Sequence, residues 1–142
     1  MNTTTDFERR INDRELRKFE EDHGELPQEF KQFMLRNNGG YPNRTKHVTD
    51  TEVVYLQRIF SIKHGALTIE HIIDVFSDPE FPLPEGTIPF GIDPTGNLFM
   101  FKGNSVCIYF QNDNNPALYK LSDSFNSFME TLQDEVDEEF EL

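Results

Sequence analysis

The chain has 142 residues and a formal net charge of -13 at pH 7, and this length fits one domain that buries roughly 68 to 70% of the surface its unfolded chain would expose. One cysteine excludes an internal disulfide, and the N-terminal MNTTTDFERR lacks the apolar segment of an export signal. No apolar run reaches the roughly 18 residues of a membrane span. We therefore expect a soluble cytoplasmic protein. So large a negative charge repels phosphate backbones, which argues against direct nucleic-acid binding.

Two amphipathic helices are predicted near the start of the chain. We expect residues 1–5 to be frayed and the first helix to run from Phe7 to Gly24, because its apolar residues recur close to helical spacing. The second helix begins at Pro27, whose missing N–H costs nothing in a first turn, and ends at Asn37-Asn38-Gly39-Gly40. Because this glycine pair follows a helix, we interpret it as a helix terminus and not as a phosphate-binding loop.

One long strand, one short helix and an exposed loop are predicted next. The strand spans Glu52 to Ile62, and Thr68 caps a helix whose apolar positions extend to Phe76. Residues 77–87 hold three prolines and three acids, which excludes a central strand or a helix and predicts a semi-rigid exposed loop. The phenylalanine and the leucine of this loop either pin it to the core or contact a partner.

An antiparallel meander is predicted at the centre of the sheet. The runs 98–102 and 106–110 are rich in aromatic and β-branched residues and flank Gly103-Asn104, which is a hairpin signal. A second turn at 93–97 joins the first run to 88–92. Apolar residues on both faces of 98–102 predict cover on both faces of the sheet. We interpret Cys107 as a small half-buried hydrophobe and not as a nucleophile.

The chain is predicted to end in a short strand, a helix and an acidic tail. The strand spans Leu118 to Leu121, and Ser122 or Asp123 caps a helix with a continuous apolar stripe. The tail from residue 134 has no basic residue and is predicted to be a solvated extension. The four histidines lack metal-ligand spacing, and no nucleophile–base pair or phosphate loop is present in the sequence. We therefore expect no metal, no cofactor and no enzymatic activity.

Four segments in a fixed order resemble the SUKH superfamily, which includes a yeast cell-wall-synthesis regulator and many bacterial immunity proteins. These segments are Leu26-Pro27-x-x-Phe30 with Asn38-Gly39-Gly40, Ile88 to Phe99, Cys107 to Phe110 before Asp113, and Ser124-Phe125-x-x-Phe128. The resemblance implies an α+β fold with a single twisted antiparallel sheet, whose central meander is packed by N-terminal and C-terminal helices. We expect one SUKH-like domain over residues 1–142, with a core at about 7–133 and an acidic tail at 134–142.

The resemblance also implies a binding function without catalytic residues. Bacterial members are typically encoded beside polymorphic toxins, many of them nucleases, and neutralise them by binding. The implied partner is a cognate toxin domain, basic and a nuclease. The alternative is a non-enzymatic interaction scaffold in cell-wall or regulatory processes, as in the yeast branch. The oligomeric state stays open between a monomer and a weak dimer. One departure is Asn97, which follows Gly96 where many members have Asp.

Negative charge is concentrated in the second half of the chain. Residues 65–142 hold 15 acids and two bases, whereas residues 1–36 and 37–64 carry charges of -2 and +2. This charge either draws in a basic partner or only keeps the domain soluble. The candidate contact residues lie on the proline-rich loop and on the loops of the meander. They are Asp78, Glu80, Phe81, Glu85, Asp93 and Asp113.

Overall fold

The computed structural model describes residues 2–111 and 116–134, which form four helices and nine strands in three antiparallel sheets. The helices are α1 (Asp13–His23), α2 (Gln28–Arg36), α3 (Ile69–Val75) and α4 (Phe125–Thr131). The strands are β1 (Thr4–Thr5), β2 (Tyr41–Pro42), β3 (Lys46–Val48), β4 (Val53–Tyr55), β5 (Arg58–Ile59), β6 (Thr87–Ile92), β7 (Leu98–Lys102), β8 (Ser105–Phe110) and β9 (Ala117–Ser122). The α+β class is confirmed, whereas the prediction of a single sheet is wrong.

The largest sheet has five strands in the order β5-β6-β7-β8-β9, and the pairs β1–β2 and β3–β4 form two smaller sheets. The strand predicted from Glu52 to Ile62 is divided between two of these sheets, because β4 pairs with β3 and β5 pairs with β6. At the division Leu56 is fully buried and donates its N–H to Thr45 O, while Gln57 donates to Ile92 O. The backbone therefore changes partner within two residues.

The N-terminal segment is extended and does not enter α1 at Phe7. Thr4-Thr5 pairs with β2, and Phe7 is 45% exposed. The helix starts after Asn12, whose side chain accepts the N–H of Glu15 at 2.8 Å while the Glu15 carboxylate accepts the N–H of Asn12 at 3.1 Å. This reciprocal capping box satisfies two N–H groups that the first helical turn leaves unpaired. The predicted frayed end and the predicted helix start are both wrong, whereas the end at Gly24 is confirmed.

Side-chain caps also fix the starts of α3 and α4. Thr68 Oγ1 accepts the N–H of His71 at 3.1 Å, as predicted. Ser124 caps α4 by accepting the N–H of Ser127 at 3.1 Å, so neither Ser122 nor Asp123 is the cap. The reason is that Ser122 still belongs to β9 and Asp123 forms an ion pair with Lys120.

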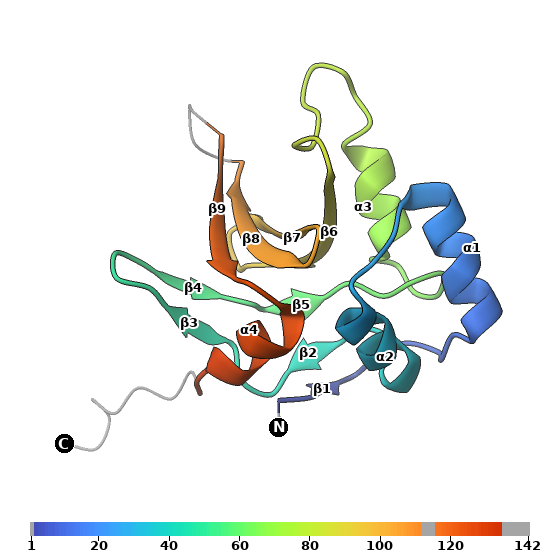
Figure 1. Cartoon of the computed structure of the whole chain (residues 1–142), viewed down its shortest axis with the longest axis horizontal. Coiled ribbons are helices and arrows are strands. Elements are labelled where there is room, and N and C mark those ends of the chain that lie inside the picture. Colours follow the sequence, from blue (N-terminus) through green and yellow to red (C-terminus); the bar gives the residue numbers. More distant parts are fainter. Residues whose placement is uncertain (1, 112–115, 135–142) are drawn as a thin grey trace.

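The meander β6-β7-β8 forms the centre of the sheet, as predicted, and α2 and α4 lie together under its curved surface (Figure 1). Phenylalanine rings join these elements. Phe90 of β6 and Phe101 of β7 stack with 4.2 Å between ring centroids, and Phe30 of α2 meets Phe101 edge-on at 4.8 Å. Phe125 of α4 lies 5.1 Å from Phe30. Edge-to-face and offset pairs of this kind add stability beyond the area they bury.

The opposite face of the sheet is covered as well. Met100 and Cys107, which pair across β7 and β8, are 0% and 4% exposed. Cys107 is thus buried rather than half-buried, which agrees with its interpretation as a hydrophobe, and burial raises the pKa of its thiol. The proline-rich loop at 77–86 contributes to this side, because its Pro82 lines one groove with Tyr109, which is on the same face of β8 as Cys107, and its Leu83 packs against the core. Phe81 of the same loop is 66% exposed, so the two apolar residues of the loop have different roles.

Candidate partner-binding surface

A groove of about 410 Å³ lies between the proline-rich loop and the end of β8. We call it the loop groove. It is lined by Val75, Phe76, Asp78, Glu80, Phe81, Pro82, Tyr109, Gln111 and Pro116. Three of the residues that the sequence nominated, Asp78, Glu80 and Phe81, are thus brought together at one site. The sequence did not predict Tyr109 and Gln111 as partner-contact residues, because its apolar alternation only places them on the more polar face of β8.

Local hydrogen bonds hold the loop in the shape that exposes Phe81. The N–H of Glu80 donates to Asp78 Oδ1 at 2.9 Å, and the N–H of Phe81 donates to the carbonyl of Asp78 at 3.1 Å. Leu83, two residues after Phe81, packs against the core and fixes that part of the loop. The Phe81 ring is therefore presented to solvent on an ordered turn, which lowers the entropy that a partner must remove on binding. Val75 at the end of α3 is a second exposed apolar residue here, with 54% exposure.

The acidic side chains around the loop groove have no basic partner in the part of the chain that the structure describes. Asp74, Asp78, Glu80 and Glu85 are all exposed. None of them takes part in an ion pair with a described lysine or arginine. Their charges are therefore not neutralised by neighbours and produce a negative potential over this end of the molecule. A basic surface is the complementary partner.

The other nominated residues lie outside the loop groove. Glu85 is exposed near the end of the loop. Asp93 is 8% exposed, and its carboxylate accepts the N–H groups of Thr95 at 2.9 Å and Asn97 at 2.8 Å and the Asn97 amide at 3.0 Å. This carboxylate is therefore engaged within its own turn. Asp113 lies outside the described residues.

Asn97, where many SUKH members have Asp, belongs to the same buried turn. It is 8% exposed, its amide donates to Asp93, and its oxygen accepts the N–H of Gln111 at 3.3 Å. The departure from the SUKH pattern therefore changes an internal contact and not a charge on an exposed surface. Because Gln111 also lines the loop groove, the turn helps to position one wall of that groove.

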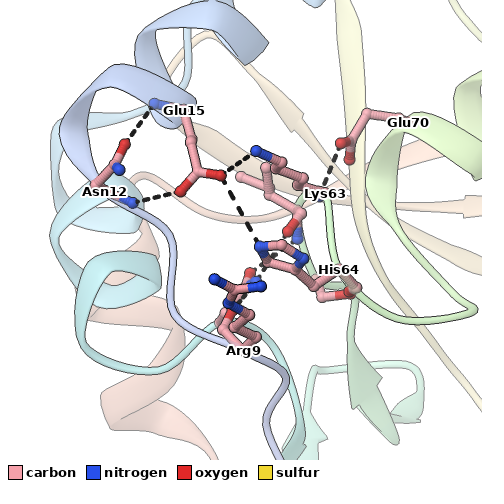
Figure 2. Close-up of polar contacts among 9 residues, drawn as sticks. Arg9, Asn12, Glu15, Lys63, His64 and Glu70 are labelled. Atoms are coloured by element: carbon pink, nitrogen blue, oxygen red, sulfur yellow. Dashed lines mark hydrogen bonds and ion pairs between the residues drawn. The ribbon is translucent and has the colours of Figure 1, made fainter.

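A second polar cluster joins α1 to the turn that follows Ile62 (Figure 2). The Glu15 carboxylate accepts a hydrogen bond from the Lys63 ammonium and lies 3.9 Å from His64 Nε2. The N–H of Lys63 donates to the Glu70 carboxylate of α3 at 2.8 Å. The hydrogen bond from Lys63, followed by that from the Asn12 N–H, lowers the pKa of Glu15 below its ordinary value. These contacts link α1 to α3 and make the cluster a structural one.

Replacing Glu15 by glutamine is expected to reduce stability more at pH 7 than at pH 3. A carboxylate whose pKa is lowered in the folded state stabilises that state above its unfolded pKa, and this contribution is lost as the pH falls through the folded pKa. Urea unfolding of wild type and Glu15→Gln at both pH values measures the difference. Asp22→Asn is the matched control, because Asp22 pairs only with exposed Lys18 at 3.3 Å. An equal loss at pH 3 would contradict this account.

The profile of the SMI1 / KNR4 family (SUKH-1) matches residues 10–131, which is most of the chain. The chain belongs to this family. The resemblance drawn from four short segments is thereby confirmed. The SUKH family includes toxin-immunity proteins and cell-wall regulators. No curated protein and no solved structure matches the chain.

In this SUKH-1 protein the segments that carry the resemblance mostly build the core. Phe30, Phe90, Phe125 and Phe128 come from three of them and are almost completely buried. The loop at 77–86 falls between two of the segments and supplies four of the nine residues that line the loop groove. The segments that carry the resemblance therefore account for much of the core, whereas all of the residues lining the loop groove except Tyr109 lie outside them.

Two other kinds of site receive no support within residues 2–111 and 116–134. There, no group of three or more histidine, cysteine, aspartate or glutamate side chains could hold a metal ion. No helix in the same ranges is long and apolar enough to cross a membrane.

Proposed function

We propose that this SUKH-1 protein is an immunity protein, which binds a cognate toxin domain in the cytoplasm and neutralises it without catalysis. The toxin is a basic nuclease. Family membership supports the class of function, because the SUKH family includes toxin-immunity proteins. The observation that carries the proposal is the loop groove, where exposed Phe81 stands between unpaired acidic side chains at a hollow of about 410 Å³.

Each part of the loop groove has a distinct role in this proposal. A nuclease binds phosphate groups through basic residues, so the carboxylates of Asp78 and Glu80 can take the place of phosphates in its cleft. Their charge accelerates encounter, because complementary potentials raise association rates more than they raise affinity. Phe81 and Val75 then lose water on contact and slow dissociation, as apolar anchors at the centre of an interface do.

The test begins with co-expression of this chain and the toxin domain encoded beside its gene, scored by survival of the host cells. Rescue is expected, and the two proteins are expected to purify as a complex. Phe81→Ala is then expected to weaken binding by about 10- to 100-fold, mainly through faster dissociation. Asp78→Lys/Glu80→Lys/Glu85→Lys is expected to slow association by at least about tenfold at low salt, and less at high salt. Stopped-flow association measures the charge variant, and the dissociation rate of the complex measures Phe81→Ala.

A matched control separates the position of the charges from their number. Glu21→Lys/Glu25→Lys/Asp50→Lys changes the net charge by the same amount, and these three exposed residues lie outside both the loop groove and the proline-rich loop. We expect this control to slow association much less than the variant at Asp78, Glu80 and Glu85. Equal effects of the two variants would show that only net charge matters. Failure to rescue cells from a toxin shown to be active would overturn the proposed function.

A further inference from the structure

The five-stranded sheet has one closed edge and one open edge. At β5 the edge is closed, because Gly40 N–H donates to Ile59 O at 3.0 Å and Ile59 N–H donates to Gly40 O at 2.8 Å. At the other end β9 pairs with β8 and with no further strand among the described residues. The six residues of β9 therefore present a row of backbone groups to solvent, and in Figure 1 this strand lies at the outer side of the sheet.

The strand register shows which groups of β9 face outward. Ser105 directly follows the two-residue turn Gly103-Asn104. In such a hairpin the N–H and C=O groups of this residue hydrogen-bond to the preceding strand, here to Lys102 of β7. Backbone directions alternate along an antiparallel strand, so Ile108 turns toward β9. Tyr119 lies opposite Ile108 and faces β8. Its neighbours Leu118 and Lys120 therefore direct their N–H and C=O groups to the open edge.

The side chains of β9 leave this edge open to pairing. Natural edge strands are commonly protected by prolines or by free charges, and residues 117–122 contain no proline. Their one charged residue, Lys120, forms an ion pair with Asp123. Tyr119 is 55% exposed and packs edge-on against Phe110 with 5.5 Å between ring centroids. Such an aromatic pair beside an open edge can receive a side chain from an added strand.

We propose that an extended segment of the toxin domain pairs with β9 as a sixth strand of the sheet. This inference rests on the proposed immunity function and specifies how the toxin is held. The loop groove reaches Pro116, directly before β9, so a segment paired with β9 extends at that end toward Asp78 and Glu80. The segment carries an aromatic or β-branched residue against Tyr119 and a lysine or arginine at the groove end. A second copy of this chain lacks that charge complementarity, since its net charge is -13.

Amide hydrogen exchange on the full chain, alone and in complex with the toxin domain, tests the added strand directly. In the complex, exchange at Leu118 and Lys120 is expected to slow by at least about tenfold, because these amides gain hydrogen-bond partners. The amides of Asp50 and Asn104, which are exposed and lie outside both β9 and the loop groove, are the internal controls and are expected to change little.

A substitution at one outward position provides a second measurement. Lys120→Pro removes an N–H that faces the open edge, where proline is tolerated in a sheet. It is expected to weaken toxin binding by about tenfold, the effect of one lost hydrogen bond, while thermal unfolding stays close to that of wild type. Lys120→Ala removes the same charge but keeps the N–H, and we expect its affinity to stay within about threefold of wild type.

The outcomes separate this inference from the proposed function. Unchanged exchange at Leu118 and Lys120 in a complex that does form overturns strand addition and leaves the immunity function standing. Slow exchange at these amides in the free chain, lost on dilution, assigns the edge to a second copy and also overturns the inference. The absence of any complex with an active cognate toxin overturns the proposed function together with it.

Discussion

Replacing Asn38 by alanine is expected to lower the free energy of unfolding by about 3 kcal/mol. Asn38 is fully buried, and its amide donates to the carbonyls of Arg9 and Ile62, both at 2.8 Å. Its oxygen accepts the N–H of Ile62 at 2.8 Å. Alanine would leave the N–H of buried Ile62 without this partner, at a cost of about 1–3 kcal/mol. It would also remove one donor each from the carbonyls of Arg9 and Ile62, although the Ile62 carbonyl still accepts the N–H of His64 at 2.7 Å. Urea unfolding followed by circular dichroism measures the loss.

Asn37→Ala is the matched control for this prediction. Asn37 is half-buried and its amide donates to Thr3 Oγ1 at 2.8 Å, so both groups can reach water once the bond is lost. We expect a loss of about 1 kcal/mol or less. A loss of this size in Asn38→Ala would contradict the account, because it would mean that the Ile62 N–H finds another partner.

The parts of the fold that depend on a few residues adjacent in the sequence could be predicted from that sequence. The hairpin at Gly103-Asn104 and the cap at Thr68 are both present, since each depends on the conformation or hydrogen bonding of a few adjacent residues. The change of sheet at Leu56 could not be predicted. The consecutive polar residues Gln57 and Arg58 that follow it do not by themselves indicate a change of sheet, and only the hydrogen bonds to the distant carbonyls of Thr45 and Ile92 reveal it.

The candidate site was predictable to a similar extent. The composition of residues 77–87 predicts Phe81 and its acidic neighbours as partner-contact residues, because prolines and acids exclude regular structure and keep the loop exposed to solvent. It could not separate exposed Phe81 from core-packed Leu83, which share the same local sequence character. It also could not show that the Asp93 carboxylate turns inward, since an aspartate in a turn is found both with a free carboxylate and with one bonded to the backbone.

Gly39→Ala is expected to destabilise the protein by about 4 kcal/mol or more, enough to reduce the yield of soluble protein. Gly39 has φ 79, a conformation that costs other residues about 1–2 kcal/mol. A Cβ atom there would also lie 2.8 Å from Ile59 O and 2.9 Å from Ser61 N. Both are backbone atoms of a buried segment, so neither can move aside as a flexible side chain would. Thermal unfolding and soluble yield measure the effect.

Gly103→Ala distinguishes the two causes of this loss. Gly103 has φ 60, but no atom lies within 4 Å of the position that its Cβ would occupy. It should therefore show only the conformational cost of about 1–2 kcal/mol. Equal losses at the two positions would mean that the close approach of Gly39 to the 59–61 backbone contributes nothing to the lost free energy of unfolding. A much larger loss at Gly39 would show that this contact, beside that of Asn38 with Ile62, holds the end of α2 against the 59–62 backbone.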